Sequence, residues 1–394
     1  MTRPATLMYL AGTQDPDAAL RYLRRGEDDP TALFVPYVRQ FLDLCEDRAA
    51  NCIVISTRPP RRTVRDAQFT FYYLPNPLRS ARGRRYELGQ VLYGLLVMVL
   101  CLVYRPRVVF AGDGILHYAT IPLLRLSGAK VVLSFHNTLW ACHSDQPDRW
   151  QGIARRCRHV FSRTVSAIMC ASGTIAGNFA EVTGGRCRPV IEFLPTFVPG
   201  QLDKVPPPPD DGACTILYAG RIMRDKGIFD VLRIAEILRD RAAGNIKVIM
   251  CGEGRHAEQS LVEAIGSRGL SAAVSFVGQL DAAQMLAQYA ETDVVVVPTT
   301  TAYREGFNHV VAEGVLAGRM VVTSRVCPAA LRFREYVRLA AADSPESYAA
   351  QIWSEYYEEG SRLASMPEEQ RQRYYEASSG WRGAAERALA YATG

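Results

Sequence analysis

The chain of 394 residues is 48% hydrophobic and 22% charged, so it is long and apolar enough to bury large cores in two domains. Its ten cysteines are scattered without a C-x2-C pair, which argues against a structural zinc site and for a reducing compartment, the cytoplasm. Residues 1–13 lack the apolar core and cleavage pattern of a signal peptide, so we expect no export. The net charge of +6 divides into about +10 for residues 1–205 and about −4 for the rest.

Apolar strands alternate with helical stretches through the first half of the chain. This alternation is typical of a mostly parallel sheet covered by helices, so the predicted fold class is α/β. We predict the strands at residues 6–11, 51–56, 69–74, 108–112, 131–135 and 168–171.

Eight arginines gather in residues 58–85 against a single acid, Asp66. The cluster favours an anionic membrane surface as a partner, because an anionic leaflet attracts nearby cations. Nucleic acid is the competing partner, but no nucleic-acid fold signature accompanies the cluster, so we expect no nucleic acid. The arginines are Arg58, Arg61, Arg62, Arg65, Arg79, Arg82, Arg84 and Arg85.

A run of fourteen apolar residues, 91–104, follows the arginine cluster. The run is too short to span a bilayer comfortably, and Arg105 and Pro106 end it before the next strand begins. We therefore expect a helix that packs in the core under the first sheet.

Residues 204–212 contain four consecutive prolines and no hydrophobic period. Such a composition predicts a stiff polar linker between domains. We expect an N-terminal domain at residues 1–203 and a C-terminal domain at residues 213–375.

The second half repeats the alternation, with strands predicted at residues 216–220, 246–251, 274–277, 293–297 and 320–323. The first of these strands leads through Gly220, Arg221 and Lys226 into a helix. A strand-to-helix turn presents backbone N–H groups and a positive dipole end to anions, and the two cations add charge-assisted bonds. This turn predicts a diphosphate site.

Residues 304–314 place Glu305 and Glu313 eight residues apart, after the buried strand 293–297 and at the start of a helix. Open α/β sheets bind ligands at the carboxyl ends of their strands. Eight helical residues rise about 12 Å, which is comparable to the span from a hexose to a ribose across a diphosphate. Each carboxylate can therefore hold one sugar, whereas the plain alternative is two solvated helix glutamates.

Four motifs follow one another in a characteristic order: G-R-x4-K-G at residues 220–227, G-E-G-R at 252–255, F-V-G at 276–278, and then the paired glutamates. Together they resemble the retaining GT-B glycosyltransferases (family 4-like, glycosyl transferases group 1). The resemblance implies two Rossmann-like domains that face each other across a cleft, with the nucleotide on the C-terminal domain and the acceptor mainly on the other. It also implies that a helix in residues 376–394 crosses back to the N-terminal domain.

The resemblance gives each matching residue a role in a reaction that uses no metal and no other cofactor. Arg221 and Lys226 stabilise the leaving diphosphate, and Glu305 binds and orients the donor sugar. His136 lies beside that sugar, and Glu313 binds the ribose hydroxyls. The other expected donor contacts are Gly220, Glu253, Gly278, Gly306, Phe307 and Asn308.

Other positions bear on the acceptor and on metal binding. Asp113 and His117 follow one strand and are candidates for binding acceptor hydroxyls. Asp15 and Asp17 precede a helix, so we expect a cap there and no metal site. The loop after the first strand, residues 10–14, contains one glycine where the family has a glycine-rich loop.

The leading hypothesis is a retaining, metal-independent hexosyltransferase that uses a nucleotide diphosphate sugar, with UDP-sugar preferred over GDP-sugar. The acceptor is a glycan or a lipid-linked saccharide of polysaccharide or glycolipid biosynthesis, met in the cytoplasm or at the inner face of its membrane. One alternative is a sugar-nucleotide 2-epimerase, which converts the donor without an acceptor. Another is a non-catalytic sugar-nucleotide-binding subunit, motivated by the altered loops.

Overall fold

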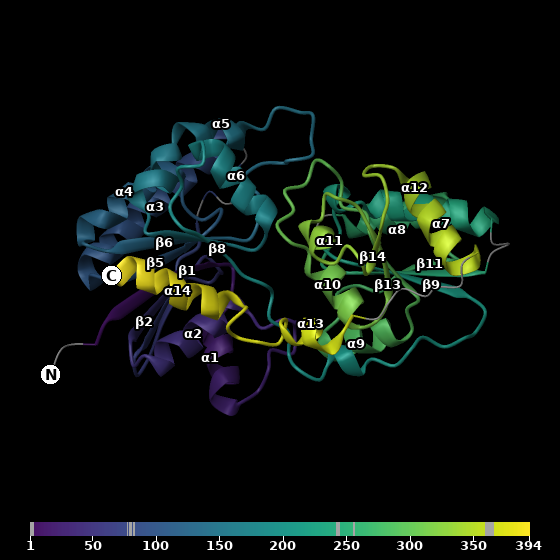
Figure 1. Cartoon of the computed structure of the whole chain (residues 1–394), viewed down its shortest axis with the longest axis horizontal. Helices are drawn as coiled ribbons and strands as arrows, with labels where there is room; N and C mark the ends of the chain where they lie inside the picture. The colour runs from purple at the N-terminus through teal and green to yellow at the C-terminus, as the bar shows by residue number, and fades with distance from the viewer. Residues whose placement is uncertain are drawn as a thin grey trace.

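The computed structural model describes residues 4–76, 78, 81, 83–241, 245–254, 257–358 and 366–394. Two separate sheets form two lobes, which we call the N-terminal lobe and the C-terminal lobe (Figure 1). The predicted α/β class with two Rossmann-like sheets facing across a cleft is confirmed.

The N-terminal lobe contains an eight-stranded sheet in the order β3-β4-β2-β1-β5-β6-β7-β8. All six strands predicted for this half are present, and among the described strands of this sheet only β3 and β4 pair antiparallel. The unpredicted strand β3 is an edge strand whose residues are mostly exposed, so no hydrophobic run marks it. The bounds are β1 (Thr6–Gly12), β2 (Asn51–Ser56), β3 (Arg62–Asp66), β4 (Phe69–Tyr73), β5 (Val108–Gly112), β6 (Lys130–Phe135), β7 (Ala167–Cys170) and β8 (Val190–Glu192).

Helices cover both faces of this sheet (Figure 1). One face carries α1 (Pro16–Arg25), α2 (Tyr37–Asp47) and α14 (Trp381–Thr393). The other carries α3 (Arg84–Tyr104), α4 (Ile121–Leu124), α5 (Arg149–Arg156) and α6 (Gly173–Thr183). The short helices η1 (Tyr118–Thr120), η2 (Arg125–Ser127) and η3 (Val160–Thr164) contact helices of this second group.

The C-terminal lobe contains a parallel sheet of six strands in the order β11-β10-β9-β12-β13-β14. The five predicted strands are present, and the short strand β14 adds an edge. The valines of β12 are all buried, because helices cover this strand on both faces. The bounds are β9 (Cys214–Ala219), β10 (Ile246–Cys251), β11 (Val274–Phe276), β12 (Val294–Val297), β13 (Met320–Thr323) and β14 (Val337–Leu339).

The helices of the C-terminal lobe again lie on two faces (Figure 1). One face carries α7 (Ile228–Arg241), α8 (Glu258–Ser267) and α12 (Pro345–Trp353), and the other carries α9 (Ala282–Ala290), α10 (His309–Leu316) and α11 (Pro328–Arg332). The remaining helices are η4 (Leu202–Lys204), η5 (Arg224–Lys226), η6 (Ser354–Glu358) and α13 (Glu368–Gln372).

The chain passes between the lobes twice. The first passage is the proline-rich segment, where the buried Arg319 donates a hydrogen bond to the carbonyl of Pro206. The second passage leads through α13 to α14, which packs against β6, β7, β8 and α2 of the N-terminal lobe (Figure 1). The Trp381 side chain is fully buried there, with its ring centroid 5.2 Å from that of Tyr9 and 5.6 Å from that of Phe110.

The expectation that residues 91–104 form a core helix is wrong for one side of that helix. Tyr93, Val97 and Cys101 of α3 are buried, but Val99 is 49% and Val103 is 68% exposed. Within the described residues, α3 is the one helix long and apolar enough to cross a membrane, with a mean hydropathy of 1.9. An unbroken apolar run predicts a single core-facing block, whereas only one face of this helix meets the core of the lobe.

Candidate functional site

A cavity of about 280 Å³ lies between the lobes, at the carboxyl ends of both sheets. Seven residues that were predicted for the site line this cavity. Other residues that line it, such as Tyr37, Tyr218 and Tyr303, were not predicted from the sequence. The seven are His136, Gly220, Arg221, Lys226, Glu305, Phe307 and Asn308.

Lys226 and Glu305 form an ion pair in this cavity. The Lys226 Nζ lies 2.5 Å from the Glu305 Oε2, and the two side chains are 13% and 8% exposed. The same oxygen accepts hydrogen bonds from Thr299 Oγ1 at 3.3 Å and from Asn308 Nδ2 at 2.9 Å. Glu305 therefore fixes the lysine ammonium at the cavity wall.

Tyr303 contacts both cationic side chains that are predicted to bind the diphosphate. The Lys226 Nζ lies 4.1 Å from the centre of the Tyr303 ring, and the Arg221 guanidinium contacts the Tyr303 hydroxyl. An aromatic face attracts cations, so the ring holds both charges on one side of the cavity. No motif drew attention to Tyr303, because its role depends on a fold that brings residues 221 and 303 together.

Gly306 lies directly against the backbone of the N-terminal lobe. A Cβ atom at this position would lie 1.6 Å from the carbonyl oxygen of His136. Only glycine therefore permits this approach of the donor loop to the end of β6.

His136 is held from several directions within the N-terminal lobe. Its Nε2 lies 3.0 Å from the Ser134 Oγ, which also accepts a hydrogen bond from Trp381 Nε1 at 2.9 Å. Asp113 accepts hydrogen bonds from the His136 backbone N–H at 3.1 Å and from Asn137 Nδ2 at 2.9 Å. Burial lowers the pKa of His136, although the negative charge of Asp113 acts to raise it. The Nδ1 atom of His136 is buried without a hydrogen-bond partner. His136 thus stands at the cavity wall as a neutral imidazole whose buried Nδ1 makes no hydrogen bond.

The two candidate acceptor residues differ in position. Asp113 does not line the cavity, but it holds the loop of His136 and Asn137, which do. His117 caps the helix η1 by accepting a hydrogen bond from the Ala119 N–H at 3.2 Å, and it does not line the cavity.

Asn308 occupies a strained backbone position at the start of α10. Its φ is +78°, and its side chain accepts a hydrogen bond from the Val311 N–H at 3.4 Å as the helix N-cap. Asparagine tolerates this conformation better than most residues, and it is also a favoured helix N-cap.

Glu313 lies inside α10 and does not line the cavity. The residue is 8% exposed, and its carboxyl group accepts a hydrogen bond of 2.8 Å from the hydroxyl of the fully buried Tyr289. Burial raises the pKa of Glu313 to about 7, although the Tyr289 hydrogen bond opposes this shift. The two glutamates of the motif therefore occupy different environments, one paired with a lysine and the other with a tyrosine.

Predicted donor glycines form the rim beside β9 and β10. A Cβ atom at Gly252 would lie 1.7 Å from the Gly220 carbonyl oxygen, and the Gly252 N–H donates to the Gly278 carbonyl at 2.8 Å. The Glu253 carbonyl accepts a hydrogen bond of 2.9 Å from the Ile222 N–H. Gly278 and Glu253 support this rim outside the cavity lining, and Arg255 lies outside the described residues.

His309 is the first residue of α10, and its ring lines the cavity and packs against the opposite lobe. Its Nε2 lies 3.3 Å from the Tyr37 hydroxyl, and its ring centroid lies 4.4 Å from that of Phe34 in the opposite lobe. Burial lowers the pKa of His309 to about 4.

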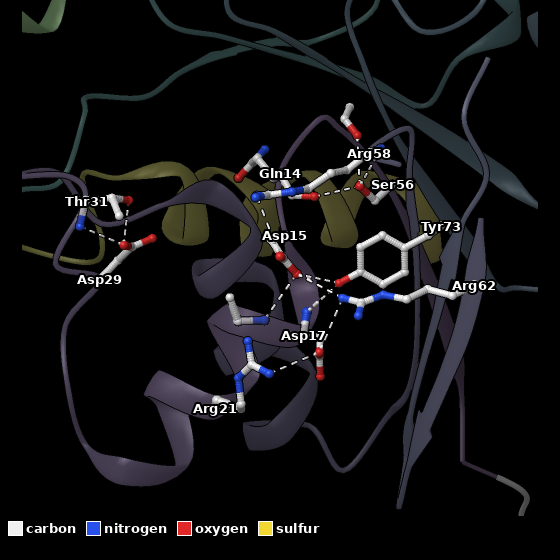
Figure 2. Close-up of polar contacts among 12 residues, drawn as sticks. Gln14, Asp15, Asp17, Arg21, Asp29, Thr31, Ser56, Arg58, Arg62 and Tyr73 are labelled. Carbon is white, nitrogen blue, oxygen red and sulfur yellow. Dashed lines mark hydrogen bonds and ion pairs between the residues drawn. The ribbon is translucent and has the colours of Figure 1, made fainter. Parts of the chain in front are cut away.

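The early loop before α1 is a structural corner, as predicted. Figure 2 shows Asp15 among Tyr73, Arg62 and the start of α1, where it caps the helix by accepting from the Ala18 N–H at 3.2 Å. Burial acts to raise the pKa of Asp15. Hydrogen bonds that Asp15 accepts from Tyr73 and Ala18, together with the positive charges of nearby arginines, nevertheless hold this pKa below its usual value. Across the described part of the chain, no three His, Cys, Asp or Glu side chains gather in a metal-binding group.

Among the described residues, the arginine cluster is divided between the corner near α1 and the start of α3. Arg58 lies 3.6 Å from Asp15, and Arg62 lies 3.4 Å from Asp17 and stacks on Tyr73, so both serve the corner in Figure 2. Arg84 and Arg85 are exposed at the start of α3, whereas Arg79 and Arg82 lie outside the described residues. The folding of β3 against β4 divides the cluster.

Known proteins resemble this chain in sequence and in structure. Residues 202–376 match the family model of glycosyl transferases group 1. The glycogen synthase of Mycobacterium tuberculosis is 27% identical over 233 residues, which cover 57% of this chain and 53% of that protein. The chain thus matches about half the length of this relative. A D-inositol 3-phosphate glycosyltransferase of Corynebacterium diphtheriae is 32% identical over 113 residues, covering 28% of this chain and 26% of that protein.

Solved structures share the fold over almost the whole chain. Sucrose-phosphate synthase from Thermosynechococcus elongatus superposes with a TM-score of 0.70 at 16% identity, covering 98% of both chains. Anabaena HepE in complex with UDP superposes with a TM-score of 0.63 at 16% identity, covering 98% of this chain and 100% of that one.

Two α/β sheets that face a shared cavity, with these structural neighbours, define the GT-B class of proteins. Within that class, the C-terminal lobe carries the match to the family model of glycosyl transferases group 1.

Proposed function

We propose that the protein is a retaining hexosyltransferase that moves a hexose from a nucleotide diphosphate sugar to a hydroxyl of a glycan or lipid-linked saccharide. The observation that carries this proposal is the convergence of Arg221, Lys226, Glu305 and His136 on one cavity between the lobes. The pathway we propose is polysaccharide or glycolipid biosynthesis. We place it in the cytoplasm, because ten unpaired cysteines favour a reducing compartment.

The cations supply the chemistry at the leaving group. Breaking the bond between a sugar and a diphosphate develops negative charge on the leaving phosphate, which fixed cations stabilise. Arg221 and Lys226 lie on one side of the cavity, where Glu305 positions the lysine. We propose that these two cations act in place of a metal ion, and that the amides of Gly306 to Asn308 approach the donor.

In the proposed reaction, the acceptor oxygen bonds to the anomeric carbon on the face from which the diphosphate departs. The bond between that carbon and the phosphate oxygen breaks, and the departing oxygen takes the acceptor proton. No side-chain base is required, which agrees with a site whose one glutamate at the wall is already paired with Lys226. His136, with its free Nδ1, contacts the donor sugar.

We further propose UDP as the nucleotide and Glu313 as the ligand of its ribose. The UDP assignment is supported by HepE, whose structure holds UDP and whose fold this chain shares. The domain limits proposed are residues 1–203, 204–212 and 213–375, with residues 376–394 returning to the first domain. Their support is the end of the first sheet at Glu192, the start of the second at Cys214 and the packing of α14.

A transfer assay with UDP-hexoses and a panel of saccharide acceptors, run with and without EDTA, tests the proposal. Lys226→Ala should lower kcat by about 10²- to 10³-fold, the usual cost of one electrostatic donor to the transition state. Lys247→Ala is the matched control, because Lys247 pairs with Asp211 on the exposed side of the same lobe.

The product identifies the reaction class. A product that keeps the donor's anomeric configuration supports retention, and an inverted product contradicts it. Loss of turnover with EDTA, restored by a metal ion, would refute metal independence. Conversion of the donor to its 2-epimer without acceptor would replace transfer with epimerisation, and donor binding without turnover would favour the non-catalytic subunit.

A further inference from the structure

An apolar stripe runs along the solvent side of α3. Its members recur at intervals of three or four residues, so they share one face of a helix about 30 Å long. Leu126, which is 68% exposed, extends the stripe from η2, the turn that packs beside α3. The stripe residues and their exposed fractions are Leu88 53%, Leu92 49%, Leu95 39%, Leu96 39%, Val99 49%, Leu102 44% and Val103 68%.

The opposite face of α3 is fixed to the N-terminal lobe. The Cys101 Sγ lies 3.7 Å from the Met8 Sδ of the central strand β1. A Cβ atom at Gly94 would lie 2.4 Å from the Thr120 Oγ1, so the helix packs closely on η1. If α3 left the lobe to cross a membrane, this core would be exposed to water. Only the outer side of α3 is therefore available to contact lipid.

Cations border the stripe at both ends. Arg84 and Arg85 are exposed at the first turn of α3, and Arg105 is exposed directly after the last. Residues 84–130 contain six Lys or Arg and two acids. Both acids are engaged, because Glu87 pairs with Arg149 and Asp113 accepts from the loop of His136.

We propose that the outer face of α3 docks on an anionic membrane surface, with the helix in the plane of the leaflet. The apolar stripe enters the boundary between headgroups and acyl chains, and the flanking arginines meet lipid phosphates. A second copy of the chain fits this face poorly. Any two-fold pairing of α3 with itself, parallel or antiparallel, brings arginines against arginines, because both helix ends are cationic.

The docking face is connected to the acceptor side of the cleft. The Tyr86 hydroxyl and the Gln90 amide, both in the first two turns of α3, donate to the Gly114 carbonyl at 3.1 and 2.7 Å. Gly114 follows Asp113, which supports the cavity loop of His136. Under the proposed function, this docking presents the acceptor side of the site to saccharides carried on lipid.

Vesicle sedimentation with the full chain tests the docking face. Wild type should sediment with vesicles of equimolar phosphatidylcholine and phosphatidylglycerol, and remain in solution with phosphatidylcholine alone. The variant Arg84→Gln with Arg85→Gln should lower partitioning about thirtyfold, because each cation near an anionic leaflet contributes roughly fivefold. The apolar variant Leu95→Gln with Val99→Gln should also lose binding.

The control variant is Val262→Gln with Arg186→Gln, which changes an exposed valine and an exposed arginine away from α3 and should bind as wild type does. Calorimetric titration with UDP should be unchanged in every variant, which separates failure of the docking face from failure of the donor site. Wild type that stays in solution with anionic vesicles overturns the proposal. So does a dimer in light scattering that the Leu95 and Val99 changes dissolve, which would assign α3 to self-association.

Discussion

The Glu305 carboxylate illustrates how a motif residue acquires a role from its neighbours. Sequence motifs predicted Glu305 and Lys226 as separate contacts to the sugar and the diphosphate. In the structure they form one buried pair, with Asn308 and Thr299 on the same oxygen. Removing one partner of such a pair leaves the other charge unpaired, so the two residues act as a unit.

Glu313 should make the stability of the protein depend on pH. Its pKa is raised to about 7 in the folded chain from an ordinary value of 4.5. The stabilisation from the bound proton is therefore complete below pH 4.5 and is lost as the pH rises through 7. Between pH 4.5 and pH 7, the free energy of unfolding of wild type should therefore fall by about 3 kcal/mol relative to that of Glu313→Gln, which has no titrating group at this position.

Urea unfolding of both proteins across this pH range measures the difference. The exposed Glu335→Gln is the control and should follow wild type at every pH. If the wild-type and Glu313→Gln curves run parallel, Glu313 does not titrate in this range and the burial argument is wrong.

At the scale of elements, the last helix completes the first sheet. Trp381 of α14 is fully buried between Tyr9 and Phe110 and donates to Ser134, which contacts His136. A helix that begins nearly 250 residues later thus positions a side chain of the candidate site.

Trp381→Phe should lower the free energy of unfolding by about 1 to 3 kcal/mol, because the buried Ser134 hydroxyl loses its indole partner. Denaturant unfolding followed by circular dichroism measures this loss. Trp353→Phe is a suitable comparison, since Trp353 is a partly exposed ring stacked on Tyr357, and it should cost less. Equal losses in the two variants would mean that the Ser134 contact contributes nothing specific.

The elements that could be predicted from the sequence are those with a strong local period. Buried strands such as β12 are continuous apolar runs, and the turn after β9 has its own glycine and cation pattern. The edge strands β3 and β14 are short and partly exposed, so no such pattern marks them. The outer face of α3 was missed because a helix that is apolar on all sides gives no indication of which side the sheet covers.

At the scale of the whole molecule, the site depends on contact between the two lobes. The motif predicted the C-terminal wall of the cavity, including Arg221, Lys226 and Glu305. It could not predict Tyr37, which lies on α2 and reaches His309 across the cleft. Contacts of this kind follow from how two separately folded sheets meet, which local sequence does not encode.

Gly306→Ala should force the lobes apart, because its Cβ atom would overlap the His136 carbonyl oxygen. We expect a larger radius of gyration in X-ray scattering and a fall in transfer activity of about 100-fold, the cost of misplacing reacting groups by roughly 1 Å. Circular dichroism should remain that of wild type.

Gly266→Ala provides the control, because a Cβ atom at this position of α8 meets no other atom within 4 Å. It should leave scattering and activity unchanged. Unaltered scattering with full activity in Gly306→Ala would show that the lobes do not need this close approach.

The return of α14 to the first lobe also has a consequence for synthesis on the ribosome. The N-terminal lobe is translated first, yet the indole that fills its centre belongs to residue 381 of 394. The nascent lobe therefore emerges with an open groove over β6 and β7, and it closes only after the C-terminal lobe has been made. Translation order and folding order diverge here, because a helix made after the C-terminal lobe completes the first sheet.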